Sequence, residues 1–193
     1  MKKPVRILLV AFLATALFSC GNQAKHDDAT EIAEEQNERN LDGNKELEKA
    51  SDFVVKAADA GMAEVQLGKL AAERATKPEV KKFAQTMVEE HTRANDELKT
   101  LAQQQNIVVP SSISEENQEK MNKLQEKQGE EFDKEYMDMM VKDHKKVVDM
   151  FEKQAENGDV PEVSEWASNK VPALRHHLEM AQSTEDAIDQ EEN

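Results

Sequence analysis

The strongest constraint in this chain is a helical apolar pattern that runs in two pairs of long segments. Apolar residues recur every three or four positions over about residues 51–75, 76–105, 131–157 and 159–188. The turn signals Thr76-Lys77-Pro78 and Gly158-Asp159-Val160-Pro161 separate the two members of each pair. The sequence shows no long alternation of strand type. We therefore predict an all-α protein in which two helical hairpins pack as a four-helix bundle.

The segment between the two hairpins, residues 106–130, is too long for a tight turn. Ser114 is a good N-cap residue, and the carboxylates of Glu115 and Glu116 suit the first turn of a helix. A short helix is therefore expected from Ser114 to about Gly129. A connection of this length can run along a whole bundle, so the predicted fold is ferritin-like, with a short extra helix in the crossover segment.

Three residues mark helix ends or irregularities in this pattern. Thr76 is the expected N-cap of the second long helix, and Asn106 is its expected C-terminal cap. Pro172 lies inside the last helical segment and predicts a kink there.

The N-terminus has the features of a bacterial lipoprotein signal peptide. Its basic start precedes an apolar run over residues 7–18 that is too short for an ordinary membrane span. The run ends in Leu17-Phe18-Ser19-Cys20, which resembles a lipobox. Cys20 is the only cysteine in the chain, so an intrachain disulfide is excluded and Cys20 is the predicted lipidation site.

Lipidation at Cys20 predicts a cell-envelope protein anchored to a membrane. Gly21 occupies the position where Asp would signal retention in the inner membrane, so we expect the outer membrane, with the protein facing the periplasm. Residues 21–50 are acidic and poor in apolar residues, which predicts a flexible stalk. A partly helical tether around residues 30–38 is the alternative. The expected organisation is a signal peptide (1–19), a lipidated cysteine with its stalk (20–50) and a bundle domain (51–190).

The formal net charge of the chain is −15, and loss of the three basic residues of the signal segment makes the mature chain more negative still. A surface of this sign repels nucleic acid, so nucleic-acid binding is excluded. The sequence identifies no protein partner.

Four polar residues are placed so that the fold would bring them together: Glu64, His91, His144 and His177. Glu64 and His91 are equidistant from the first turn signal, and His144 and His177 are equidistant from the second. Equidistant residues lie side by side in an antiparallel hairpin, so two packed hairpins place all four in one central layer. Each has mostly apolar neighbours three and four positions away, which indicates a core position.

Two interpretations of this layer follow from its chemistry. The four side chains either satisfy one another in a structural hydrogen-bond network or bind one transition metal ion, for which zinc, iron, manganese and nickel suit the donor set. A ferritin di-iron centre is excluded because Val88, Val141 and Leu174 stand where its motif needs Glu. Copper ranks behind the other metals. The methionines on the same faces (Met87, Met140 and Met180) favour it, but methionine at this spacing is usually core packing.

Residues spread over all four segments resemble the bacterial family called domain of unknown function 4142. They are Phe53-Val54, Ala57-Ala58, Glu64-Val65, Leu67-Gly68, Val80-Lys81, Phe83-Ala84, Met87-Val88, His91, Phe132-Asp133, Tyr136-Met137, His144, Pro172, His177-Leu178 and Met180-Ala181. The resemblance covers about residues 51–188. It implies a ferritin-like fold and an exported protein, often labelled an outer membrane protein, and it implies no activity.

The sequence contains no nucleophile elbow, phosphate loop, dinucleotide fingerprint or CxxC motif. It therefore favours a protein that is not an enzyme. Two main functions stay open: a lipid-anchored envelope protein that binds one metal ion through Glu64, His91, His144 and His177, or a non-catalytic interaction or stress-protective domain in which this cluster is structural. An enzyme that uses the same metal is a third alternative, with less support.

Overall fold

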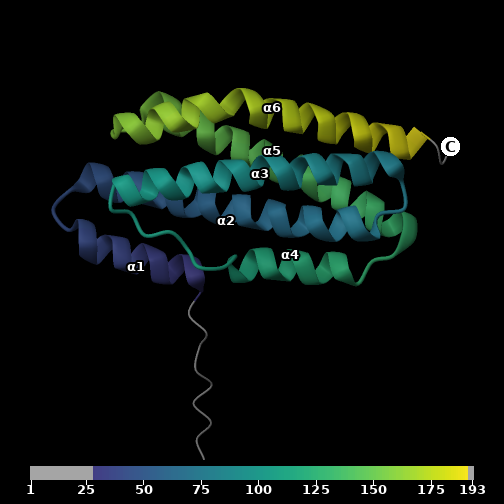
Figure 1. The fold of residues 1–193 in the computed structure, drawn as a ribbon, viewed down its shortest axis with the longest axis horizontal. Helices are drawn as coiled ribbons and strands as arrows, with labels where there is room; N and C mark the ends of the chain where they lie inside the picture. The colour runs from purple at the N-terminus through teal and green to yellow at the C-terminus, as the bar shows by residue number, and fades with distance from the viewer. Residues whose placement is uncertain (1–27, 191–193) are drawn as a thin grey trace, which may run out of the picture.

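The computed structural model describes residues 28–190 and is entirely helical over that range (Figure 1). Its helices are α1 (Ala29–Leu41), α2 (Lys45–Arg74), α3 (Pro78–Gln104), α4 (Glu115–Gln125), α5 (Gly129–Asn157) and α6 (Pro161–Gln190). The four long helices run side by side as the hairpins α2–α3 and α5–α6 (Figure 1). This confirms the predicted all-α four-helix bundle with a short extra helix in its crossover. None of the described helices has the length and hydropathy of a membrane span.

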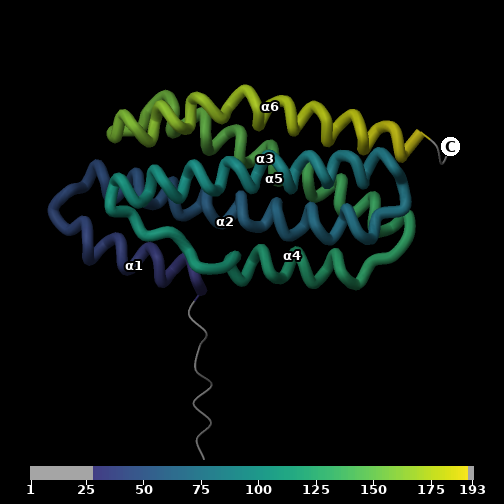
Figure 2. Tube along the Cα trace, in the orientation of Figure 1, coloured from purple at the N-terminus to yellow at the C-terminus, as the bar shows by residue number. Residues whose placement is uncertain are grey.

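The crossover is the segment that connects the first hairpin to the second, and it runs along the length of the bundle. It leaves the end of α3, passes beside α1 and continues as α4 to the end where α5 begins (Figure 2). Ser114 is the N-cap of α4 as predicted, and its hydroxyl accepts a hydrogen bond from the Asn117 N–H. The Asp59 carboxylate on α2 accepts bonds from the Ser114 N–H at 2.7 Å and the Asn117 amide at 2.8 Å. These bonds fix the start of α4 against α2.

Residues 29–50, which we expected to be flexible, are helical and partly buried. They form α1 and the first turns of α2, and Ala33, Asn37 and Leu41 of α1 are buried. The Asn37 side chain donates to the Val108 carbonyl at 2.8 Å and accepts from the Val108 N–H at 2.7 Å. Such paired bonds to the crossover let a helix with few apolar residues pack stably, which is why composition alone was misleading. The predicted signal peptide and Cys20 lie outside the described residues.

The start of α3 is capped differently from our prediction. Lys77, not Thr76, is the N-cap residue, and its side chain makes no capping bond. The Asp133 carboxylate on α5 takes the capping role instead. It accepts from the Thr76 N–H at 3.0 Å, the Thr76 hydroxyl at 2.6 Å and the Lys77 N–H at 2.8 Å. The cap is therefore a contact between the two hairpins, which local sequence could not reveal.

The end of α3 agrees with the capping residue predicted from the sequence, and Pro172 lies inside α6 as expected. Asn106 follows the C-cap of α3 in the left-handed conformation (φ 55°), in agreement with its predicted capping role. Helix α6 continues across Pro172.

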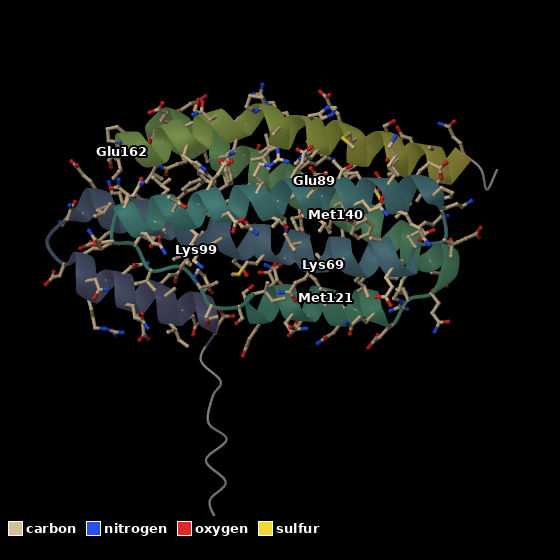
Figure 3. The ribbon with its side chains drawn as sticks, viewed as in Figure 1. Lys69, Glu89, Lys99, Met121, Met140 and Glu162 are labelled. Carbon is tan, nitrogen blue, oxygen red and sulfur yellow. The ribbon has the colours of Figure 1, made fainter. Side chains whose placement is uncertain are left out.

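The core consists of two apolar clusters arranged along the bundle axis. One cluster includes Leu67, Phe83, Met87, Phe132, Tyr136 and Met140. The other includes Phe53, Leu98, Phe151, Val163 and Leu174. Charged side chains such as Lys69, Glu89, Lys99 and Glu162 are exposed, whereas Met121 and Met140 are buried (Figure 3).

Replacing Asp133 with alanine is expected to lower the free energy of unfolding by about 3 kcal/mol. The substitution leaves the Thr76 and Lys77 N–H groups at the start of α3 without their hydrogen-bond acceptor. Each unsatisfied group costs about 1–3 kcal/mol. Chemical denaturation of the full chain measures the change. The matched control is Asp138→Ala on the same helix, which removes only a surface pair with Lys142. Equal effects of the two substitutions would contradict the capping role.

Candidate metal centre

The four predicted residues lie in one layer between the two apolar clusters. On each long helix the polar residue separates members of one cluster from members of the other: Glu64 on α2, His91 on α3, His144 on α5 and His177 on α6. All four side chains are buried, with between 1% and 7% of the residue exposed. The equal spacing from the two turns therefore located them correctly at one depth in the bundle.

The three histidines form a compact triangle. The centroids of the His91 and His144 rings are 5.6 Å apart, those of His91 and His177 5.2 Å, and those of His144 and His177 5.6 Å. One nitrogen from each ring lies within 4.8 Å of the other two. A metal ion about 2.1 Å from each nitrogen holds its ligands no more than about 4.2 Å apart, so small rotations of the rings would close the triangle around an ion.

Two of the rings are oriented by hydrogen bonds on their outer sides. His144 Nδ1 lies 2.9 Å from the Met140 carbonyl oxygen, and His177 Nε2 lies 2.8 Å from Oε2 of Glu90. A carbonyl and a carboxylate accept hydrogen bonds, so these two nitrogens are the donors. The opposite nitrogens, His144 Nε2 and His177 Nδ1, consequently carry lone pairs. Bonds of this kind orient histidines in metal sites.

One nitrogen on each ring of the triangle has no hydrogen-bond partner within the described part of the chain. His91 Nε2, His144 Nε2 and His177 Nδ1 are buried and pair neither with one another nor with Glu64. The arrangement is suited to a ligand that accepts electron pairs from all three nitrogens.

Glu64 lies beside the triangle and is not one of its members. Its Oε1 is 3.7 Å from His144 Nδ1, the outer nitrogen, and its Oε2 has no hydrogen-bond partner. The expected four-residue arrangement is thus a triangle of histidines with a carboxyl group behind one of them. Burial raises the pKa of Glu64, although the neighbouring His144 opposes this change.

The pKa values of two histidines also follow from burial. Desolvation lowers the pKa of His91 well below its usual value, and the nearby His144 and His177 lower it further. Burial lowers the pKa of His177, partly offset by its hydrogen bond to Glu90. Both rings are therefore neutral at neutral pH, which is the state in which imidazole binds metals.

Sequence reasoning missed Glu90 and Asp143, which immediately precede His91 and His144. The Glu90 carboxylate accepts a hydrogen bond from His177 Nε2 on the neighbouring helix α6. Asp143 pairs with Lys120 of α4 at 3.1 Å and is only 16% exposed. The turn of about 100° per residue places both at helix edges that face a neighbouring helix, but which helix lies there is a tertiary property. Met87 and Met140 belong to an apolar cluster and Met180 packs against it, consistent with core packing.

The metal-free protein is expected to lose stability as the pH falls below about 6.5, the ordinary pKa of histidine. In this range the unfolded chain binds protons at His91 and His177, whereas the folded protein, with its lowered pKa values, does not. The raised pKa of Glu64 acts in the opposite direction, since acidification favours the folded state there. Urea denaturation at a series of pH values from 7 to 5 gives the free energy of unfolding at each pH. A plot of this free energy against pH should have a steeper slope for wild type than for His91→Gln. The exposed His176 provides the control, because His176→Gln should keep the wild-type slope. Identical slopes in all three proteins would contradict this account.

Comparison with known proteins agrees with the fold. Two solved structures are similar to it: CopM in the Cu(II)-bound form (TM-score 0.61, 19% identity, covering 72% of this chain and 96% of that chain) and CopM in the Ag-bound form (TM-score 0.57, 20% identity, covering 69% and 93%). No curated protein sequence matches the chain. The sequence profile of the family described as "Domain of unknown function (DUF4142)" matches residues 33–184, including the triangle and Glu64. The chain therefore belongs to the DUF4142 family.

Proposed function

We propose that this protein binds one transition metal ion through His91, His144 and His177. Two observations carry the proposal. Each buried histidine has one ring nitrogen within 4.8 Å of a nitrogen of the other two, and each has a buried ring nitrogen with no hydrogen-bond partner among the described residues. An unsatisfied buried polar group costs about 1–3 kcal/mol, so three of them together strongly favour a ligand for the site. A single cation would satisfy all three lone pairs at once.

The surroundings of the triangle also suit a cation. The Glu90 carboxylate bonds the outer nitrogen of His177, and the Glu64 carboxyl group lies behind His144. A carboxylate that accepts a hydrogen bond from the outer ring nitrogen, as Glu90 does, orients a metal-binding histidine and increases its basicity. A divalent ion would also favour the ionised form of Glu64, because it supplies the opposite charge that the buried carboxyl group lacks.

The donor set narrows the choice of metal. Three imidazole nitrogens suit zinc, copper, iron and nickel, whereas manganese prefers oxygen ligands and is disfavoured here. The similarity to CopM, which was solved with Cu(II) and with Ag, supports placing copper first among the ions to be tested. Copper is therefore the first metal to test, although the sequence alone ranked it behind the other metals. Methionine ligation is not needed for this choice, since imidazole alone is a good copper ligand.

We further propose that the protein carries this metal in the cell envelope, attached to the outer membrane through lipid on Cys20. The support is the lipobox Leu17-Phe18-Ser19-Cys20 with Gly21 after it. A lipid-anchored bundle facing the periplasm would meet metal ions before they reach the inner membrane. The proposal describes a metal-binding protein without enzymatic activity.

Metal analysis of protein purified without chelator or affinity tag tests the proposed site. We expect about one equivalent of bound copper or zinc, a higher melting temperature at saturation, and stabilisation by about 2.7 kcal/mol when free metal is 100 times its dissociation constant. His91→Ala should abolish binding. His176→Ala is the matched control, because His176 adjoins His177 in sequence but is exposed. Glu90→Ala should weaken binding about 10–100-fold by removing the support of His177.

Two results would contradict the metal site. One is wild-type protein that binds no copper, zinc, iron or nickel and shows no change in melting temperature, which would favour the structural interpretation. The other is undiminished binding in His91→Ala, which would place the metal elsewhere on this acidic chain.

Lipidation is tested separately in a bacterial host that processes lipoproteins. Wild-type protein should fractionate with membranes and have a mass increased by the lipid on Cys20. Cys20→Ser should remain an unlipidated precursor. A wild-type mature chain with an unmodified Cys20 would refute the anchor and leave the metal site unaffected.

A further inference from the structure

A cavity of about 210 Å³ adjoins the histidine triangle and extends to the surface between α3 and α6, where its lining residues Arg93, Glu97 and Ala173 are exposed. All four long helices contribute to its wall, and the three histidines and Glu64 are part of that wall. Four alanines line this space, namely Ala57, Ala60, Ala94 and Ala173, whereas the room left by Gly61 is taken by the Asn95 side chain. Native cores contain few voids larger than a water molecule, because unfilled space forfeits packing contacts. Small residues around one void beside a cluster of lone pairs therefore indicate a binding site.

The wall of the cavity is mostly apolar and partly aromatic. Leu98, Val147, Phe151, Trp166 and Leu174 line it, and the Phe151 and Trp166 ring centroids are 5.4 Å apart. An apolar cavity of about 150 Å³ accommodates benzene. The present cavity is larger, so one aromatic ring with a small substituent fits the available space.

The polar end of the cavity determines which substituent is recognised. His144 Nδ1 and His177 Nε2 donate to Met140 and Glu90, so their other nitrogens can only accept. Those nitrogens are buried and unpaired, as is His91 Nε2. Besides a metal ion, the natural partner of such a lone pair is a hydroxyl group that donates its hydrogen. The buried Trp166 Nε1, also without a partner, adds one donor to the same wall.

We propose that this cavity binds a small phenol, with the ring against the apolar wall and the hydroxyl group donating to a histidine of the triangle. The inference goes beyond metal binding and does not require the metal, because the hydroxyl group uses the histidine lone pair directly. Access is from the side between α3 and α6, where Glu97 and Lys170 form an ion pair at the rim and the Lys170 ammonium lies 6.0 Å from the centre of the Trp166 ring. The neutral phenol would pass this charged rim into an apolar interior.

The test uses the metal-free full chain and phenol itself as the probe. Trp166 is the only tryptophan, so its fluorescence reports directly on the cavity wall, and ligand-observed NMR provides an independent titration. We expect saturable binding of phenol, and binding of toluene that is weaker by about tenfold, as the loss of one hydrogen bond implies. Equal binding of phenol and toluene would overturn the assignment of the hydroxyl group.

A cavity-filling variant shows where the ligand binds. Ala94→Leu places a larger side chain in the cavity and should weaken phenol binding at least about tenfold. Ala187→Leu makes the same change at an exposed position of α6 outside the cavity and should leave phenol binding unchanged. Equal phenol binding by wild type and Ala94→Leu would overturn the proposal.

Metal binding by the same variant separates this inference from the proposed function. Ala94→Leu retains all three histidines, so it should still take up one equivalent of metal and should be folded by circular dichroism. Metal uptake without phenol binding in wild type would overturn only the phenol site. Phenol binding without metal uptake would support the phenol site and overturn only the metal proposal.

Discussion

The structure depends on how a bundle of four helices accommodates a buried polar layer at its middle. Two apolar clusters supply the hydrophobic stabilisation, and Glu64, His91, His144 and His177 separate them on every long helix. Desolvation lowers the pKa values of His91 and His177 and raises that of Glu64, which favours the uncharged forms of these three groups in the core. Each histidine of the layer has one buried ring nitrogen without a hydrogen-bond partner among the described residues.

The geometry of that layer is maintained by contacts some distance from it. Asp133 caps α3 from α5 and so joins the two hairpins, while Asp59 of α2 holds the start of α4. Asn37 joins α1 to the crossover through two backbone bonds. Each of these side chains satisfies backbone groups of a distant segment, which fixes the positions of the helices along the bundle axis. Small shifts along that axis would separate the histidines, so these contacts support the site indirectly.

Metal and small molecule would use the same feature of the fold, the lone pairs of the triangle. The hydrogen bonds to Met140 and Glu90 show that His144 Nδ1 and His177 Nε2 carry the ring hydrogens. The other nitrogen of each of these two rings therefore has a lone pair that can bind a ligand. Small residues on the facing helices then leave room next to those free nitrogens. A metal ion held by three histidines with space beside it would have an open coordination position, as in zinc sites that bind an exogenous ligand. If the triangle binds metal as proposed, the cavity would make it an open site and not a closed structural one.

The sequence by itself determined the helical class, the two hairpins, the crossover helix and the depth of the four central residues. These features depend on apolar periodicity and on turn residues, which are local, and on the symmetry of a hairpin, which relates residues equidistant from its turn. Only the tertiary structure decided that Glu64 lies outside the triangle, that Glu90 supports His177, that Asp133 caps α3 and that residues 29–50 pack on the bundle. Each of these depends on the rotation of a helix about its axis or on a contact between distant segments, because the side chain nearest to a given atom is set by packing between helices and not by spacing along one of them.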